Sequence, residues 1–276
     1  MKAPNILVFD SGLGGLTVYR EVAGALPNAR YLYVADDAFF PYGGRDEGAL
    51  IARLIELMGG LIATHRPDLV IIACNTASTL VLPQLRARFQ VPFIGTVPAI
   101  KPACALSVSK RVSVLGTQAT IAREYTRALI RDFANGADVT LVGSGELAAL
   151  AEAQLRGESV DDGAIAAEFA GCFVDAGGRR TDTVVLACTH YPLLLDAFTR
   201  LAPWPVRFID PAPAIARRAL ELVGSPPGAP PPRSQAGGRA RILFTSGRAP
   251  SPALSAALAG FGLGEAAPDN GRQGVV

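Results

Sequence analysis

The sequence predicts an α/β protein made of two similar domains, whose mostly parallel sheets face each other across a central cleft. Two observations support this fold class. Segments typical of buried strands alternate along the chain with segments of helical periodicity, which is the pattern of parallel sheets covered by helices. In addition, a nine-residue segment occurs twice, as DLVIIACNT (68–76) and DTVVLACTH (182–190). Such an internal repeat indicates two related structural units in one chain.

In the first half of the chain, the predicted strands are apolar runs without alternation, as expected for strands buried on both faces. The first of them, Ile6–Asp10, ends in a Gly-rich turn. We expect strands at 6–10, 31–37, 69–74 and 92–97, and helices at 17–26, 46–64 and 78–89.

The same alternation begins again after the segment 98–102. We expect strands at 111–117, 138–144, 183–188, 206–210 and 241–247, and helices at 121–133, 146–156, 163–176 and 191–201. Five prolines in the first eight residues of the segment 225–238 exclude a helix or a central strand there, so this segment is predicted to be a surface loop. The last residues, 265–276, are predicted to be a loose tail.

Composition excludes several classes of protein. Of the 276 residues, 50% are hydrophobic and 18% are charged, which is typical of a folded chain and not of a disordered one. The net charge is +2 with no cluster of Lys and Arg, so nucleic acid is not an expected partner. There is no signal-peptide pattern and no apolar run near ~18 residues, so we expect no membrane span and a cytoplasmic location.

The four cysteines are too scattered for a disulfide framework, and only Cys188 and His190 are spaced at all like zinc ligands. A metal site is therefore not favoured. Cys74 and Cys188 instead occupy equivalent places in the repeat, at the carboxyl end of a buried strand and just before a helix. Open parallel sheets bind their ligands at this edge. A helix N-terminus also lowers the pKa of a thiol from its usual ~8.5.

Two such thiols on opposite sides of one crevice suit a specific reaction. Inversion of a carbon centre by proton transfer needs a base on one face and an acid on the other, and a thiolate and a thiol can serve as this pair. The sequence therefore favours cofactor-independent racemisation by Cys74 and Cys188. The remaining cysteines, Cys104 and Cys172, are predicted to be core residues because free Cys is commonly buried.

Three other functions compete with this one. Gly12-Leu13-Gly14-Gly15 followed by Asp36 loosely imitates a dinucleotide-binding fingerprint, although Thr17 stands where its third Gly belongs. A Cys-dependent hydrolase or decarboxylase would need only one of the two thiols. A non-catalytic role in binding a partner protein is neither supported nor excluded by the sequence.

The chain also resembles the aspartate/glutamate racemase family. The motifs that carry this resemblance are FDSGLGGLTV (9–18), ADDAFFPYG (35–43), ACNTAST (73–79), VLGTQATI (114–121), ACTHYPLL (187–194) and FTSG (244–247). Together, DSGLGG and the paired Cys motifs are specific, whereas any one of them alone would be weak.

The resemblance implies two flavodoxin-like α/β domains, with 1–97 plus 208–264 forming the first and 98–207 the second. It implies no pyridoxal phosphate, no metal and no nucleotide cofactor. The implied reaction is the interconversion of L-glutamate and D-glutamate, which supplies D-glutamate for peptidoglycan, with aspartate as the alternative substrate. It also implies a homodimer.

Carried over residue by residue, the resemblance assigns Cys74 and Cys188 as the catalytic bases, assisted by Asp10 and His190. It assigns substrate-binding positions to Ser11, Asp36, Pro41, Tyr42, Gly43, Asn75, Thr76, Thr120, Glu152 and Thr189. Glu152 is aligned through the RGE that follows it, and Glu146 is the alternative for this acidic position. Arg248 departs from the pattern, because an acidic residue is common there.

Overall fold

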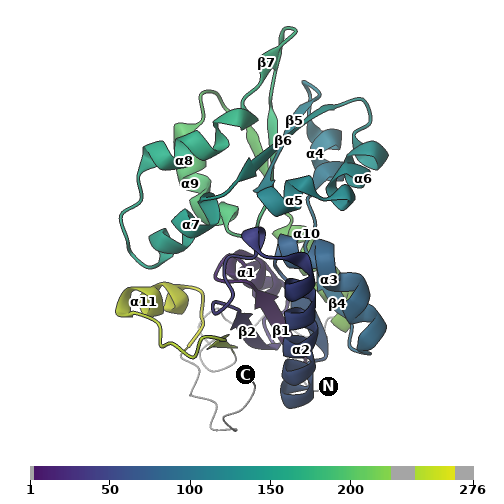
Figure 1. Cartoon of the computed structure of the whole chain (residues 1–276), viewed down its shortest axis with the longest axis vertical. Helices are drawn as coiled ribbons and strands as arrows, with labels where there is room; N and C mark the ends of the chain where they lie inside the picture. Colours follow the sequence, from purple (N-terminus) through teal and green to yellow (C-terminus); the bar gives the residue numbers. More distant parts are fainter. Residues whose placement is uncertain (1–2, 225–239, 265–276) are drawn as a thin grey trace.

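The computed structural model describes residues 3–224 and 240–264, which form two lobes, one above the other in Figure 1. The lower lobe is built on a five-stranded sheet and the upper lobe on a four-stranded sheet. Every strand pairing within these two sheets is parallel. The predicted fold class, an α/β protein of two domains with mostly parallel sheets, is therefore confirmed.

The first sheet has the strand order β11-β2-β1-β3-β4. Its strands are β1 (Asn5–Asp10), β2 (Arg30–Ala35), β3 (Leu69–Ile72), β4 (Phe93–Gly95) and β11 (Ala240–Phe244). Helices α1 (Leu16–Ala25), α10 (Ala212–Val223) and α11 (Pro252–Gly260) share a core with one face of this sheet, and α2 (Glu47–His65) and α3 (Asn75–Arg88) share a core with the other. Because both faces are covered, the central strands are continuously apolar.

The second sheet has the strand order β10-β9-β5-β6. Its strands are β5 (Arg111–Thr117), β6 (Asp138–Ser144), β9 (Thr183–Ala187) and β10 (Arg207–Ile209). One face packs against α4 (Ile100–Leu106) and α6 (Glu124–Phe133), and the other packs against α7 (Leu147–Leu155), α8 (Asp162–Phe169) and α9 (Leu195–Leu201). Short helix α5 (Gln118–Ala122) follows β5 directly.

The two sheets repeat one topology. In the first sheet the order β2-β1-β3-β4 corresponds to β6-β5-β9-β10 in the second. Strands β3 and β9, which lead to Cys74 and Cys188, therefore occupy equivalent positions beside the first strand of each unit. The duplication inferred from the repeated nine-residue segment is thus visible in the strand order.

Some predicted helices differ from those in the structure. The helix expected at 163–176 stops at Phe169, and the chain continues through the 3-10 turn Ala170–Cys172 into a hairpin of β7 (Asp175–Ala176) and β8 (Arg179–Arg180). Gly177 and Gly178 turn this hairpin with φ values of 60° and 73°, in the left-handed region that glycine adopts most readily. The hairpin projects at the top of Figure 1.

The helix expected at 121–133 is interrupted, because Arg123 adopts an extended conformation between α5 and α6. Helices α4, α10 and α11 were not predicted. In α4, Pro102 lies in the first turn, where a missing N–H costs no helical hydrogen bond.

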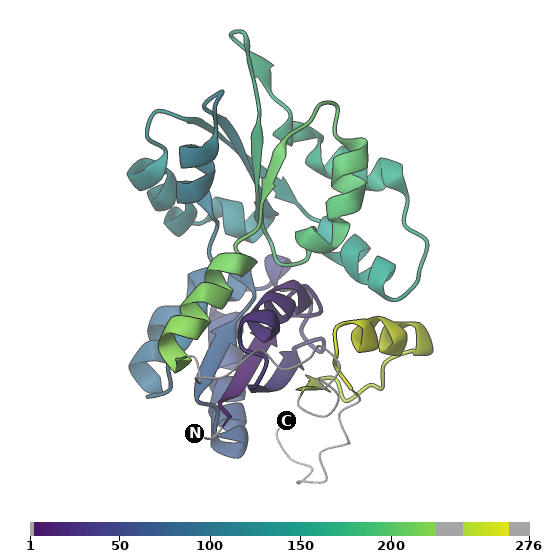
Figure 2. The ribbon, with the colours of Figure 1, turned by 180° about the vertical axis from the view of Figure 1, so that it is seen from behind.

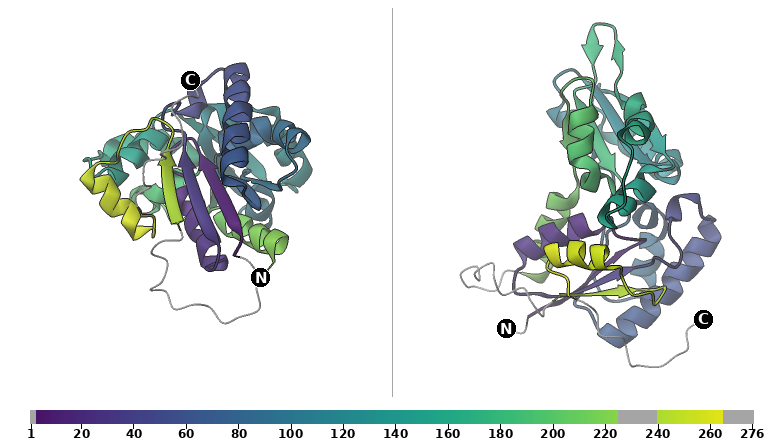
Figure 3. Two further views of the ribbon diagram at one scale, coloured as in Figure 1. Left: turned by 90° about the horizontal axis from the view of Figure 1, so that it is seen from below. Right: turned by 90° about the vertical axis from the view of Figure 1, so that its left-hand side faces the viewer.

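The C-terminal segment completes the first lobe. Figure 3 shows β11 beside β2 at the edge of the first sheet, and Figure 2 shows α10 lying against the same lobe. Strand β10 still belongs to the second sheet, so the chain returns to the first lobe between Ile209 and Ala212. The discontinuous first domain stays a prediction, and Phe208 and Ile209, which it includes, pair with β9 in the second sheet. The proline-rich loop and the tail 265–276 fall outside the described residues.

Among the described helices, α2 alone has the length and apolar composition that could cross a membrane. Leu50, Leu54, Met58 and Leu61 of this helix are buried, and they belong to the core on one face of the first sheet. Asp46 caps its first turn by accepting a hydrogen bond from the Ala49 N–H.

Candidate active site

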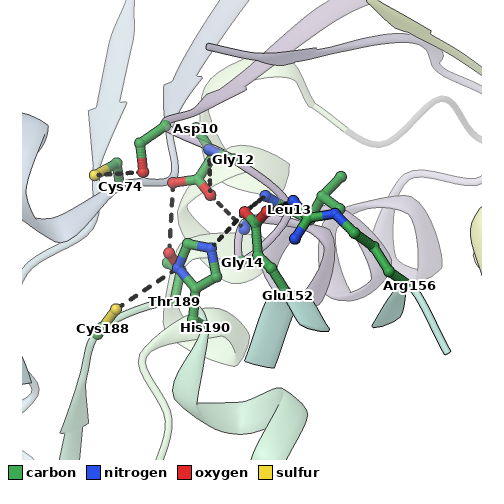
Figure 4. A network of polar contacts seen from close by, with 12 residues as sticks. Asp10, Gly12, Leu13, Gly14, Cys74, Glu152, Arg156, Cys188, Thr189 and His190 are labelled. Carbon is green, nitrogen blue, oxygen red and sulfur yellow. Dashed lines mark hydrogen bonds and ion pairs between the residues drawn. The ribbon is translucent and has the colours of Figure 1, made fainter. Parts of the chain in front are cut away.

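The predicted site residues gather where the carboxyl ends of the strands of both sheets meet between the lobes. Asp10 ends β1, Cys74 follows β3 and Cys188 follows β9. Figure 4 shows both sulfur atoms on one side of a polar network that includes Asp10, His190 and Glu152. The position agrees with the general location of ligand sites in parallel sheets.

Cys74 is the N-cap residue of α3, which begins at Asn75 and not at the predicted Ser78, so Cys74 lies just before a helix as expected. Its Sγ accepts a hydrogen bond from the Ala77 N–H at 3.5 Å and lies 3.7 Å from the hydroxyl of Ser11. Burial raises the pKa of the thiol and the charge of Asp10 raises it further, although the contacts with Ala77 and Ser11 lower it. The expectation that the helix terminus lowers the pKa of Cys74 is therefore wrong in net direction, because desolvation outweighs the N–H groups.

Cys188 is followed by the 3-10 turn Tyr191–Leu194 and then by α9, so no α-helix begins directly after it. Its Sγ lies 3.7 Å from Nδ1 of His190, which is itself buried. Burial alone would lower the pKa of His190, but hydrogen bonds with Cys188 and Glu152 raise it well above its usual value. His190 can therefore hold a proton next to Cys188.

Glu152 connects His190 to the other lobe. Its Oε1 lies 3.0 Å from His190 Nε2 and accepts a hydrogen bond from the Leu13 N–H at 2.9 Å, while its Oε2 pairs with Arg156. Burial would raise the pKa of Glu152, but His190, Leu13 and Arg156 lower it below its usual value. Glu146, the alternative at this position, is exposed at the start of α7.

Asp10 contacts groups of both lobes. Its carboxylate accepts hydrogen bonds from the N–H groups of Gly15 at 2.9 Å and Gly12 at 3.4 Å, and from the hydroxyl of Thr189 at 3.4 Å. The side chain is completely buried. A charge in such a place is supported by these donors, because an unpaired buried carboxylate would be costly.

Hydroxyl and amide groups line the neighbouring part of the site. The hydroxyl of Thr76 lies 3.2 Å from that of Thr117 and 3.4 Å from that of Thr120, so α3 of one lobe contacts α5 of the other. Both polar side-chain atoms of Asn75 are buried, and no hydrogen-bond partner is described for either. An amide left in this way is suited to bind a polar substrate, because buried polar groups are usually paired.

The segment after β2 reaches the site through Tyr42 and Gly43, where Pro41 precedes the short turn Tyr42–Gly44. Asp36 directly follows β2 and contacts this segment through the Tyr42 hydroxyl. Its carboxylate binds the Arg53 guanidinium at 2.7 and 2.5 Å, the Tyr42 hydroxyl at 2.6 Å and the Thr245 hydroxyl at 2.6 Å.

Burial would raise the pKa of Asp36, but these three partners lower it. Because the Tyr42 hydroxyl donates to its carboxylate, Asp36 anchors Tyr42. Its assignment as a substrate-binding residue stays a prediction.

Sequence reasoning missed several residues that hold this arrangement. Tyr33 donates from its hydroxyl to the carbonyl of Gly12 at 2.9 Å, and Thr17 contacts the carbonyls of Gly14 and Thr189. Arg53, Thr117, Arg156 and Thr245 were also missed. Thr117 directly precedes the QATI segment and had a local signal, whereas the partners of Arg53 and Thr245 are distant in sequence.

Within the described residues, no group of three His, Cys, Asp or Glu side chains has the arrangement of a metal site.

Each of the two parallel sheets presents one buried thiol, and both thiols lie next to a shared network of carboxylates and an imidazole. These are the features expected of a two-base isomerase. The family model that matches residues 6–219 is that of the Asp/Glu/Hydantoin racemases. The chain belongs to this family. The resemblance deduced from its motifs is therefore confirmed.

Similar proteins indicate which activity of the family this chain has. The chain is 55% identical over 263 residues to the glutamate racemase of Sinorhizobium medicae (strain WSM419), covering 95% of each chain. It is 52% identical over 262 residues to that of Brucella ovis, covering 94% of this chain and 92% of the relative. These similarities confirm the prediction of an isomerase of the glutamate racemase kind.

Solved structures agree with this result. The Escherichia coli glutamate racemase, solved in complex with L-glutamate and the activator UDP-MurNAc-ala, has a TM-score of 0.81 and 37% identity, covering 95% of this chain and 98% of the other. The Bacillus anthracis isoform RacE1 has a TM-score of 0.76 at 24% identity, covering 98% and 99%, and shares the fold.

Proposed function

We propose that this chain interconverts L-glutamate and D-glutamate without a cofactor, by moving a proton on and off the α-carbon with Cys74 and Cys188. The observation that carries the proposal is the equivalent placement of the two thiols, at the ends of β3 and β9 of two sheets with the same topology. A relative at 37% identity was solved with L-glutamate bound, and this supports glutamate as the substrate. The comparisons do not favour aspartate.

In this mechanism one thiolate removes the α-proton from one face, and the opposing thiol delivers a proton to the other face. His190 holds a proton 3.7 Å from the sulfur of Cys188. On the other side, Ser11 lies the same distance from the sulfur of Cys74, and the charge of Asp10 acts on that thiol. Each half of the reaction thus has its own polar assistant.

Glutamate brings two carboxylates and an ammonium group. Asn75, Thr76 and the N–H groups at the start of α3 are suited to bind a carboxylate without arginine. The carboxyl group of Asp10 is suited to the ammonium, whereas both oxygens of Glu152 already have partners in His190, Leu13 and Arg156. The D-glutamate formed would supply peptidoglycan synthesis, and by resemblance the enzyme would act as a cytoplasmic homodimer.

The test is enantiomer conversion by metal-chelated, pyridoxal-free enzyme. We expect it to convert each enantiomer of glutamate into the other, with aspartate a poor substrate, measured by chiral chromatography on a panel of amino acids. Dependence on pyridoxal phosphate or a metal ion would contradict the two-thiol mechanism, and a preference for aspartate would contradict the substrate.

A further inference from the structure

We propose that Arg156 is a positioning residue for the half of the reaction carried by Cys188, because its guanidinium holds Glu152 in the orientation that presents His190 to the thiol. The inference rests on the proposed function. It extends that function to a residue outside the predicted site, one that acts through Glu152.

The first step of the argument is the division of roles between the two oxygens of Glu152. Arg156 lies one helical turn after Glu152 and forms an ion pair with Oε2. Oε1 lies 3.0 Å from His190 Nε2 and accepts the Leu13 N–H at 2.9 Å. With Oε2 held by Arg156, Oε1 remains directed at the imidazole, as Figure 4 shows.

The second step is burial. The side chains of Glu152 and His190 are only 2% and 3% exposed, whereas that of Arg156 is 40% exposed. An exposed ion pair usually contributes little, but this one ends on a buried carboxylate. Removing Arg156 would leave Oε2 without its charged partner inside the protein, which is unfavourable.

The third step is that the described contacts of Arg156 lead to one thiol, that of Cys188. From Arg156 the described contacts run through Glu152 and His190 to Cys188. Cys74 instead contacts Ser11 and Ala77, and neither of these contacts Arg156 in the described hydrogen bonds. Loss of Arg156 should therefore slow proton transfer at Cys188 much more than at Cys74.

Rates alone cannot show this asymmetry. L-glutamate and D-glutamate have equal free energies, so kcat/KM must be equal in the two directions for any variant. We expect Arg156→Gln to lower both values about fivefold, as for the loss of a partly exposed counter-ion. Primary deuterium isotope effects separate the two proton transfers, because each enantiomer labelled at the α-carbon reports only its own abstraction.

The experiment measures the isotope effect on kcat/KM with α-deuterated L-glutamate and α-deuterated D-glutamate. By family resemblance Cys188 removes the proton from L-glutamate and Cys74 removes it from D-glutamate. In Arg156→Gln the step at Cys188 becomes more rate-limiting. We therefore expect the isotope effect to increase for L-glutamate and to decrease for D-glutamate.

The pH profile gives a second measurement. His190, Arg156 and the hydroxyl of Tyr33 interact with the charge of Glu152, while Asp10 and Cys188 act on His190 from the other side. Removing the cation raises the pKa of Glu152, so the acidic limb of kcat/KM should move to higher pH in Arg156→Gln.

Two variants serve as controls. Arg156→Lys keeps the charge and should restore most of the activity and the wild-type isotope effects. Arg218→Gln removes a matched exposed ion pair, with Glu221 three residues away on α10, and should change nothing. Unchanged kcat/KM in Arg156→Gln, or isotope effects that change equally for both enantiomers, would overturn the role of Arg156 while leaving the proposed function intact. A wild-type enzyme that does not racemise glutamate would overturn both.

Discussion

At the residue scale, the two thiols have different surroundings although they occupy equivalent positions in the repeat. Cys74 has a hydroxyl neighbour in Ser11, and its thiol pKa is raised by burial. Cys188 has the imidazole of His190 as its neighbour, and the buried carboxylate of Glu152 supports that imidazole. The surroundings of the two thiols are therefore chemically distinct.

Single-thiol variants test this arrangement. If each thiol reaches the α-proton of only one enantiomer, removal of one thiol stops inversion but leaves the other able to remove and return a proton. In deuterated water, Cys188→Ala should incorporate deuterium only into D-glutamate and Cys74→Ala only into L-glutamate, each with retention, as followed by NMR and chiral chromatography. Exchange of both enantiomers by one variant, or appreciable racemisation, would contradict two-base catalysis.

The acidic residue of the site, assigned to Glu152 with Glu146 as the alternative, gives another test at the residue scale. Glu152 is buried against His190 and Leu13, whereas Glu146 is exposed. We expect Glu152→Gln to lower kcat/KM by about 10²-fold, because the neutral amide no longer supports a protonated His190. Glu146→Gln is the matched control and should change kcat/KM little. The reverse order of the two effects would show that the acidic residue of the site is Glu146.

At the scale of the elements, the turn between β1 and α1 is packed closely under residues of the other lobe. A Cβ atom added at Gly14 would lie 2.5 Å from His190 Nδ1 and 2.6 Å from the backbone nitrogen of His190. One added at Gly12 would overlap Glu152 Oε1. The glycines of DSGLGG are thus explained by close approach of the backbone, a role found for glycine in ligand-binding turns.

A glycine pair tests this explanation. Gly14→Ala should shift His190 and lower kcat/KM by about 10²-fold, since a displacement near 1 Å can cost this much in catalysis. Gly24→Ala adds the same methyl group in α1, where nothing lies within 4 Å, and should keep activity and raise stability by ~0.5–1 kcal/mol. Steady-state kinetics and thermal unfolding of both variants distinguish the two effects. Full activity in Gly14→Ala would show that the turn tolerates a side chain.

At the scale of the whole molecule, the site exists only where the lobes meet. Leu13 contacts Glu152, Thr17 contacts Thr189, and Asp10 contacts Thr189 across the boundary. On the other side of the site, Arg123 of the upper lobe pairs with Glu47 of the lower lobe at 2.8 Å. Several of the contacts between the lobes are therefore made by groups that also form the site.

The ion pair of Glu152 and His190 predicts how the free energy of unfolding depends on pH. The lowered pKa of Glu152 adds stability above its unfolded value of about 4.3, which is lost as the pH falls through the folded value. The raised pKa of His190 adds stability that is complete below its unfolded value of about 6.5 and is lost as the pH rises towards the folded value.

The pair should consequently stabilise the fold most between about pH 5 and pH 6.5. We expect Glu152→Gln to lower the free energy of unfolding more at about pH 6, inside this window, than at about pH 9, measured by urea denaturation. Glu146→Gln should show little dependence on pH. A larger loss at pH 9 would contradict the protonated state of His190.

The sequence by itself determined the alternation of strands and helices, the duplication, and the positions of both thiols at strand ends. These features follow from local periodicity and from the repeated segment, so they need no knowledge of distant contacts. The sequence also placed Glu152 ahead of Glu146 through the RGE that follows it. What it could not determine was the net pKa shift of Cys74, because burial and the charge of Asp10 are products of folding.

Only the tertiary structure decided which distant residues support the site. Asp36 meets Thr245 because β11 pairs with β2, more than two hundred positions away in sequence. Glu152 meets Leu13 across the two lobes, 139 positions away in sequence. No periodicity along the chain encodes such pairs, since they arise when two separately folded sheets are brought face to face and their buried polar groups must find partners.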